Sequence, residues 1–250
     1  SYTTPPLPSE MYTYRLNIDG IYNIAPNNPF SCRDVGTLFS LFYINGGNGD
    51  YYQVRDVPHG DVTTTWYHSD ILGSERRLSV YTPPFYDKNI QSYPVLYLLH
   101  GSGGDENAWL ELGCTARFID NRYRTIPDKR PRAIAGLSMG GFHTLYISLN
   151  YPDYFNYIGL FSAGLSANGV DPNSPMYTNL DEKLGNLKRS GYQLFWIGIG
   201  KDDFLYDANQ QFRQRMDSLG MKYQYVESTR GHIWANWRAY LLQFAPMLFK

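Results

Sequence analysis

The sequence predicts an α/β fold in which a doubly wound, mostly parallel sheet follows a short all-β segment. Three observations support this prediction. Beyond residue 60, apolar runs of strand length alternate with segments of helical spacing, as in a parallel sheet with crossover helices. A G-x-S-x-G motif, Gly136–Gly140, stands between one such run and a helical segment. Before residue 60, the pattern contains strands and turns only.

Length, charge and cysteine content narrow the class of protein. The chain has 250 residues and a formal net charge of −1. This length suits one large α/β domain, alone or with a small companion. The balanced charge gives no field that would attract nucleic acid or an anionic membrane, and no apolar run reaches the roughly 20 residues needed to span a bilayer. Cys32 and Cys114 form no C-x-x-C motif, so we expect free, buried thiols and no metal site built on them.

Residues 1–60 indicate part of a β-sandwich followed by a linker. Tyr12–Ile18 alternates apolar and polar residues, and Asp19-Gly20 is a hairpin turn signal. Leu38–Ile44 is a second apolar strand. An immunoglobulin-like sandwich needs about 100 residues. We therefore interpret this stretch as a partial immunoglobulin-like module, with Asp56–Gly60 in the linker.

Residues 61–250 form the predicted α/β domain. It opens with an antiparallel pair of strands, Val62–His68 and Arg77–Thr82. Pro94–His100 is a continuous apolar run, which predicts a strand buried on both faces of a parallel sheet. The run leads into the glycine-rich loop His100–Gly104, at the strand end where such sheets bind ligands.

The next stretch is too short for this fold. A sheet of this kind should carry a helix, a strand and a second helix between His100 and Arg132. One helix is predicted, at about Trp109–Asp120, and no strand-like run follows it. We therefore predict that a segment is missing between Asn121 and Arg122, and that the sheet loses a strand without it.

The G-x-S-x-G motif has the surroundings of a nucleophile elbow. Arg132–Leu137 is an apolar strand, and Gly141–Asn150 has helical spacing. Ser138 would therefore sit on a sharp turn, with its hydroxyl exposed at the carboxyl end of a strand. Such a turn needs small neighbours, which the flanking glycines provide. A glycine-rich surface turn would leave the apolar strand unexplained.

The remaining chain continues the alternation of strands and helices. Strands are predicted at three apolar runs, Tyr157–Ser162, Gln193–Ile199 and Met221–Val226. Helices are predicted at Asp181–Ser190, at Phe204–Leu219, and from Trp234 to Phe249.

A serine nucleophile needs a base to take its proton and a carboxylate to orient that base. In a sheet of this type, the chain order is serine, acid, histidine. The candidates are Ser138, Asp203 and His232, each placed just after a predicted strand. Asp202 is the alternative acid, although a carboxylate there would also cap the following helix. We interpret the other four histidines as structural or solvated.

Acyl transfer places negative charge on the carbonyl oxygen of the substrate, and two backbone N–H groups should meet it. The N–H of Met139 follows the nucleophile, and the N–H of Ser102 comes from the glycine-rich loop. No P-loop, dinucleotide fingerprint, H-E-x-x-H or EF-hand pattern is present. We infer no cofactor and no metal.

Taken together, these motifs resemble a known family. His100–Asp105 with Trp109, Gly136–Gly141, Gly200–Leu205 and Gly231-His232 look like the esterase D-type branch of the α/β-hydrolases. Within that branch, the chain most resembles feruloyl esterases of carbohydrate esterase family one. The resemblance covers about residues 61–250, and a truncated immunoglobulin-like module often precedes such esterases.

The resemblance implies hydrolysis of ferulate or acetate esters on arabinoxylan by a secreted or periplasmic enzyme. It maps the triad onto Ser138, Asp203 and His232. A feruloylated or acetylated xylan oligosaccharide would be the partner, with a sugar-facing rim formed by aromatic residues such as Trp109 or Trp234.

Other functions fit the same residues. An acetylxylan esterase would use the same triad with a smaller acyl pocket. A hypothesis from a different class is a carbohydrate-binding protein without catalytic activity. The intact triad argues against this hypothesis. A mycolyl- or thioester-directed relative is a weaker option.

Overall fold

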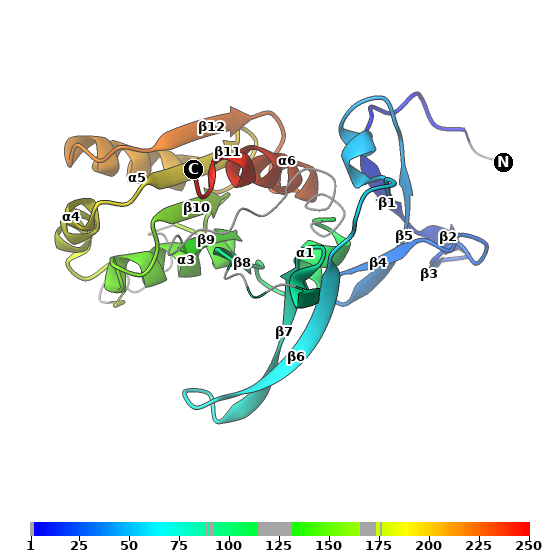
Figure 1. Cartoon of the computed structure of the whole chain (residues 1–250). Helices are drawn as coiled ribbons and strands as arrows, with labels where there is room; N and C mark the ends of the chain where they lie inside the picture. Colours follow the sequence, from blue (N-terminus) through cyan, green and yellow to red (C-terminus); the bar gives the residue numbers. More distant parts are fainter. Residues whose placement is uncertain (1–2, 89, 91–92, 115–131, 166–173, 176) are drawn as a thin grey trace. The chain divides into compact units, whose positions relative to one another are not determined.

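The computed structural model describes residues 3–250 except 89, 91–92, 115–131, 166–173 and 176 (Figure 1). By its contacts, the chain divides into two compact units. Unit 1 comprises Ser1–Gln91 and Gly103–Thr125, and unit 2 comprises Ser92–Ser102 and Ile126–Lys250. The boundary between the units therefore does not lie at residue 60. The two strands that come after the expected linker belong to unit 1, together with the N-terminal strands. A domain boundary at residue 60 stays a prediction.

Unit 1 contains small antiparallel sheets, as its strand patterns predicted. Three strands pair in the order β1-β5-β4, and a separate hairpin joins β2 to β3. These strands are β1 (Met11–Tyr14), β2 (Leu16–Ile18), β3 (Ile21–Asn23), β4 (Ser31–Asp34) and β5 (Thr37–Tyr43). The β2–β3 turn has positive φ at Asp19 and Gly20, which is what a tight two-residue hairpin requires. The sheets are antiparallel, and their identity as an immunoglobulin-like module stays a prediction.

A long hairpin and a short helix complete unit 1. β6 (Asp61–Ser69) pairs with β7 (Ser74–Thr82) along their whole length. Helix α1 (Ala108–Glu111) is shorter than the predicted helix, whose remainder reaches into residues outside the described ranges. The 3-10 turns are η1 (Asn48–Tyr52) and η2 (Tyr86–Lys88). Cys32 and Cys114 are both buried, and neither forms a disulfide, as expected.

Unit 2 is built on a five-stranded parallel sheet in the order β8-β9-β10-β11-β12 (Figure 1). Its strands are β8 (Val95–Leu99), β9 (Arg132–Leu137), β10 (Tyr157–Phe161), β11 (Leu194–Gly200) and β12 (Gln224–Ser228). Its helices are α3 (Met139–Asn150), α4 (Leu180–Ser190), α5 (Tyr206–Ser218) and α6 (Trp234–Phe244), followed by the 3-10 turn η3 (Ala245–Met247). Because all five strands run the same way, their carboxyl ends share one edge.

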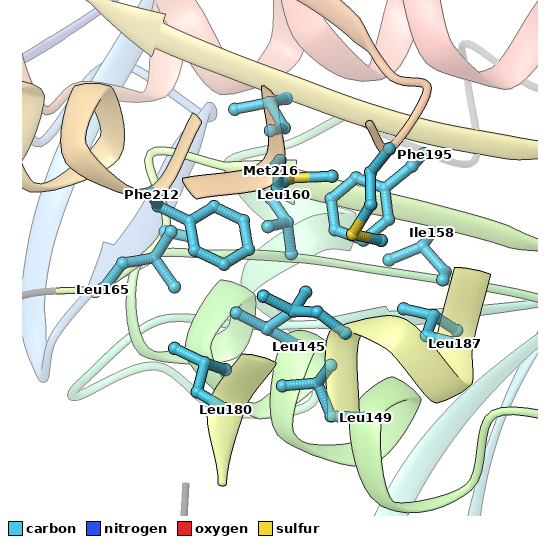
Figure 2. Close-up of a cluster of buried hydrophobic side chains, with 14 of the residues drawn as sticks. Leu145, Leu149, Ile158, Leu160, Leu165, Leu180, Leu187, Phe195, Phe212 and Met216 are labelled. Carbon is cyan, nitrogen blue, oxygen red and sulfur yellow. The ribbon is translucent and has the colours of Figure 1, made fainter. Parts of the chain in front are cut away.

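Helices cover both faces of this sheet, as the doubly wound prediction requires. On one face, Ile158, Leu160 and Ile197 pack against side chains from α3, α4 and α5, several of which are labelled in Figure 2. On the opposite face, Phe161 and Trp196 contact aromatic rings of α6. Burying each large apolar side chain contributes about 1.5–3 kcal/mol. The core therefore fixes the strands whose ends carry the candidate site.

The prediction for β8 is wrong in one respect. Its apolar run predicted burial on both faces, yet Val95 and Tyr97 are exposed. Within the described ranges, β8 pairs only with β9 and forms the edge of the sheet. A strand is buried on both faces only where layers and neighbouring strands cover it. The predicted break between Asn121 and Arg122, which bears on that edge, lies outside the described residues.

No helix in the described part of the chain is both long and apolar enough to cross a bilayer.

Candidate active site

Ser138 occupies the sharp turn between β9 and α3. Its backbone angles, φ 52° and ψ −117°, lie in a region that non-glycine residues rarely adopt. A Cβ atom on Gly136 would lie 2.3 Å from the carbonyl oxygen of Gly140, and one on Gly140 would lie 2.4 Å from that of His100. The turn is therefore closed to larger residues at both positions. Strain of this kind costs about 1–3 kcal/mol and is typical of functional sites.

Asp203 and His232 form a hydrogen-bonded pair. His232 Nδ1 lies 2.9 Å from Asp203 Oδ2 and 3.1 Å from Oδ1. Asp203 is 4% exposed, whereas Asp202 is exposed. With a carboxylate at this distance, Nδ1 carries the proton, which leaves Nε2 as the acceptor that a general base needs. Of the two adjacent aspartates, the structure brings Asp203 to the histidine.

Two opposing effects act on the pKa of Asp203. Burial raises it, and hydrogen bonds from His232 and from the Leu205 N–H, the latter 3.0 Å from Oδ1, lower it. The hydrogen bonds prevail, so the pKa of Asp203 lies below its ordinary value. The carboxyl is therefore ionised near neutral pH and can stabilise a positively charged imidazole.

Backbone hydrogen bonds at the end of β10 link the strand that leads to Ser138 with the strand that leads to Asp203. The Ser138 N–H donates to the carbonyl of Phe161 over 2.9 Å, and the Ser162 N–H donates to the carbonyl of Gly198 over 2.8 Å. The ends of β9, β10 and β11 are thus held side by side. Between the described residues, no hydrogen bond joins Ser138 Oγ to His232. Catalytic hydrogen bonds are often long before a substrate binds, so the role of Ser138 stays a prediction.

Gly101, which precedes the predicted oxyanion donor Ser102, lies beside Ser138. A Cβ atom on Gly101 would approach Ser138 Cβ to 3.3 Å, so the loop after β8 runs directly past the nucleophile position. Among the described residues, the N–H groups of Ser102 and Met139 donate no backbone hydrogen bond. Both remain available to an oxygen atom of a ligand.

Two aromatic rings contact the imidazole of His232. The ring of Phe204 lies 4.7 Å from it between centroids, and the ring of Trp237 lies 4.8 Å away at 84°. Neither residue was predicted to belong to the site. Phe204 directly follows Asp203, which is the one signal that could have drawn attention to it.

The two tryptophans predicted to contact the sugar differ in position. Trp234 begins α6, and its ring packs edge-on against Trp237 with centroids 5.2 Å apart. Trp109 belongs to α1 in unit 1 and is 5% exposed. Because the Trp109 ring is buried, it offers little surface to a sugar. Trp234 is therefore the better candidate for a contact with the sugar.

His100 and His143 are poorer candidates for the base. His100 Nδ1 lies 2.8 Å from the carbonyl of Gly101. Burial and the neighbouring His100 lower the pKa of His143. Of the histidines in unit 2, which the structure describes at all three positions, His232 is the one paired with a carboxylate.

Comparisons with known proteins show the family of the chain. A model of the Esterase family, described as "Putative esterase", matches residues 116–248. The chain is 26% identical over 306 residues to an endo-1,4-beta-xylanase/feruloyl esterase from Xylanibacter ruminicola, an alignment covering 99% of this chain and 39% of that protein. It is 23% identical over 228 residues to an acetyl esterase from Caldicellulosiruptor saccharolyticus, covering 62% of this chain and 83% of that one.

The solved structures agree as well. One described as a ferulic acid esterase matches with a TM-score of 0.61 and 26% identity, over 74% of this chain and 96% of its own. The five-stranded parallel sheet thus has the α/β-hydrolase fold. Because the family model matches more than half of its residues, the chain belongs to this esterase family.

Proposed function

We propose that the chain is a serine esterase that releases ferulic or another hydroxycinnamic acid from feruloylated arabinoxylan through an acyl-enzyme intermediate. Two observations carry the serine mechanism: the hydrogen bond between His232 and the buried Asp203, and the strained turn at Ser138. The likeness to the Xylanibacter protein, whose name includes feruloyl esterase, supports the choice of substrate. This chain spans 39% of that protein, so the substrate is a proposal.

The proposed reaction has two halves. Ser138 Oγ attacks the ester carbonyl carbon while His232 Nε2 takes its proton. The carbonyl oxygen becomes negatively charged and accepts hydrogen bonds from the N–H groups of Ser102 and Met139. The tetrahedral intermediate collapses, the sugar oxygen leaves with the proton from His232, and an acyl-serine remains.

A water molecule then completes the cycle. His232 accepts a proton from the water, whose oxygen attacks the acyl carbon. The second tetrahedral intermediate collapses to the free acid, and His232 Nε2 returns its proton to Ser138 Oγ. Asp203 remains ionised throughout and stabilises the imidazolium in both halves.

The proposed substrate also bears on location. Arabinoxylan is a polymer of the plant cell wall, so an enzyme acting on it would be secreted or periplasmic. The antiparallel sheets of unit 1 would precede the catalytic domain as a partial immunoglobulin-like module. These statements rest on the proposed substrate and on family resemblance.

The test is a release assay on a feruloylated arabinoxylan oligosaccharide. The wild type should release ferulate, and Ser138→Ala should lose about 10⁴–10⁶-fold in kcat, as loss of a nucleophile does in serine hydrolases. Equal turnover by Ser138→Ala would overturn the site assignment. Binding of the oligosaccharide without turnover of any ester by the wild type would favour an inactive binding protein.

An acetylxylan esterase is the second candidate, favoured by the likeness to the Caldicellulosiruptor acetyl esterase. The triad would be the same, and the acyl group smaller. Rates on methyl ferulate and on an aryl acetate separate the two. Efficient turnover of the acetate with hardly any of the ferulate would replace the first proposal by the second.

A further inference from the structure

Phe204 is an exposed aromatic residue held in a rigid part of the site. Its side chain is 77% exposed, although the residues on either side, Asp203 and Leu205, are 4% and 8% exposed. The Asp203 N–H donates to the carbonyl of Gly200, and the Tyr206 N–H donates to that of Asp203. The loop is thus anchored on both sides, and the exposure of Phe204 is fixed by the fold rather than by a loose segment.

The ring of Phe204 also touches the catalytic machinery. It lies 4.7 Å from the His232 imidazole between centroids, at an angle of 50°. Trp237 contacts the same imidazole, but it is buried and belongs to the core under α6. Phe204 therefore covers the imidazole from the solvent side and leaves much of its own surface open. An exposed apolar ring that contacts the imidazole of the proposed base lies where part of a bound substrate must come close.

The chemistry of ester cleavage indicates which part of a substrate would contact the Phe204 ring. In acylation, His232 hands its proton to the leaving oxygen, so the alcohol part of the ester must lie next to the imidazole. The acyl carbonyl faces the other way, toward the N–H groups of Ser102 and Met139. A ring packed against the imidazole is therefore on the leaving-group side.

We propose that Phe204 is a platform for the alcohol part of the substrate, which in a xylan ester is a sugar ring. The C–H faces of a pyranose or furanose are apolar and pack well on an aromatic side chain. This inference rests on the proposed function, and it assigns Phe204 to the leaving group rather than to the acyl group.

Two substrates with one acyl group test the proposal. Methyl ferulate and a feruloylated arabinoxylan oligosaccharide give the same acyl-enzyme and differ only in the alcohol. Phe204→Ala should lower kcat/KM for the oligosaccharide about tenfold more than for methyl ferulate, the size expected for loss of an apolar contact in a binding site. Phe204→Trp should retain the preference for the oligosaccharide.

A matched control is available at the other end of the sheet. Tyr151 is 55% exposed and lies just after α3, at the amino-terminal edge of the strands. Tyr151→Ala removes an exposed aromatic ring from the same unit and should change neither substrate's kcat/KM.

The outcomes separate this inference from the proposed function. If the wild type cleaves neither ester, the proposed function fails. If both are cleaved and Phe204→Ala lowers both equally with a shifted pH profile, Phe204 acts only through His232 and the platform is refuted. A loss that follows the acyl group, seen on methyl ferulate against methyl acetate, would equally overturn the assignment to the leaving group.

Discussion

Burial and hydrogen bonding have opposite effects on the pKa of the Asp203 carboxyl. Burial favours the neutral acid, whereas His232 and the Leu205 N–H favour the carboxylate, and the net effect lowers the pKa of Asp203. A charged, oriented carboxylate keeps the proton of the imidazole on Nδ1. The proposed role of His232 as the base thus depends on the burial and the hydrogen bonds of Asp203.

Replacing this carboxylate should mainly affect turnover. Asp203→Asn keeps the size of the side chain but favours the wrong tautomer of His232, so kcat should fall by about 10⁴-fold. Asp202→Asn is the matched control, because Asp202 is exposed and not paired with His232. Its kcat on methyl ferulate should stay within a few-fold of wild type. A larger loss in Asp202→Asn than in Asp203→Asn would reverse the assignment of the acid.

The lowered pKa of Asp203 also predicts a pH dependence of stability. Because the folded-state pKa lies below the ordinary value of 3.8, ionised Asp203 stabilises the fold above that value, and the contribution is lost as pH falls through the folded-state pKa. The difference in free energy of unfolding between wild type and Asp203→Asn should therefore shrink as pH drops toward 3. Urea denaturation of both proteins between pH 7 and pH 3 measures it. A difference that grows toward low pH would contradict this account.

Some residues of the candidate site could be identified from the sequence, and others could not. Ser138, Asp203 and His232 could be proposed because a motif and a chain order specify them. The preference for Asp203 over Asp202 agrees with its burial and its bond to His232. Phe204 was missed because a pattern of apolar residues predicts burial, and here an apolar residue is exposed beside a histidine distant in sequence.

At the scale of elements, the turn between β9 and α3 depends on close backbone approach. Gly136 and Gly140 stand where any side chain would meet backbone atoms. The strand before the turn and the helix after it are both buried in the core, so the turn cannot relax by moving them. The strain at Ser138 is therefore maintained by packing on both sides.

The same substitution at two glycines should have opposite effects. Gly136→Ala forces a methyl group to 2.3 Å from a backbone oxygen, so we expect a loss of about 1–3 kcal/mol in the free energy of unfolding. The displaced serine should also lower kcat/KM by about 10²-fold. Gly185 lies within α4, where a Cβ would meet only the flexible end of Arg189 at 3.4 Å. Gly185→Ala should therefore stabilise by about 0.5–1 kcal/mol.

Thermal and chemical denaturation of the two variants provide the comparison. Stabilisation by Gly136→Ala, or equal destabilisation by both, would show that close approach at the turn is not what Gly136 provides.

Local patterns predicted most elements of unit 2, and long-range pairing explains the exceptions. β9 and β10 lie where their apolar runs placed them, and Gly191 ends α4 with a positive φ. The prediction that β8 is buried on both faces was wrong, because a run of apolar residues does not show whether other strands or helices cover the strand. β12 begins at Gln224 rather than Met221, because Met221 joins the core instead of the strand ladder.

For the whole molecule, the main difference from a relative is the length of the chain. The alignment with the Xylanibacter protein runs over 306 residues, whereas this chain has 250, so the relative carries segments that this chain lacks. The exposed edge at β8 is where a further strand of the sheet would pair. Neither fact places those segments at a particular position of this chain, so the missing segment between Asn121 and Arg122 stays a prediction.

Peptide mapping tests that prediction. Trypsin cleaves after Arg117 and Arg122, so a continuous chain yields the peptide Phe118–Arg122. In the protein produced from its natural gene, we expect this peptide to be replaced by longer ones. Detection of Phe118–Arg122 would show that the two residues are joined directly and that the sheet ends at β8.

We propose that Ser138 is the nucleophile and that His232 and Asp203 activate it. Labelling with a fluorophosphonate, followed by mass spectrometry of the peptides, tests this assignment. We expect one adduct per chain, on Ser138, with labelling abolished in Ser138→Ala and greatly slowed in His232→Ala. An adduct on another residue, or labelling of His232→Ala at the wild-type rate, would contradict it.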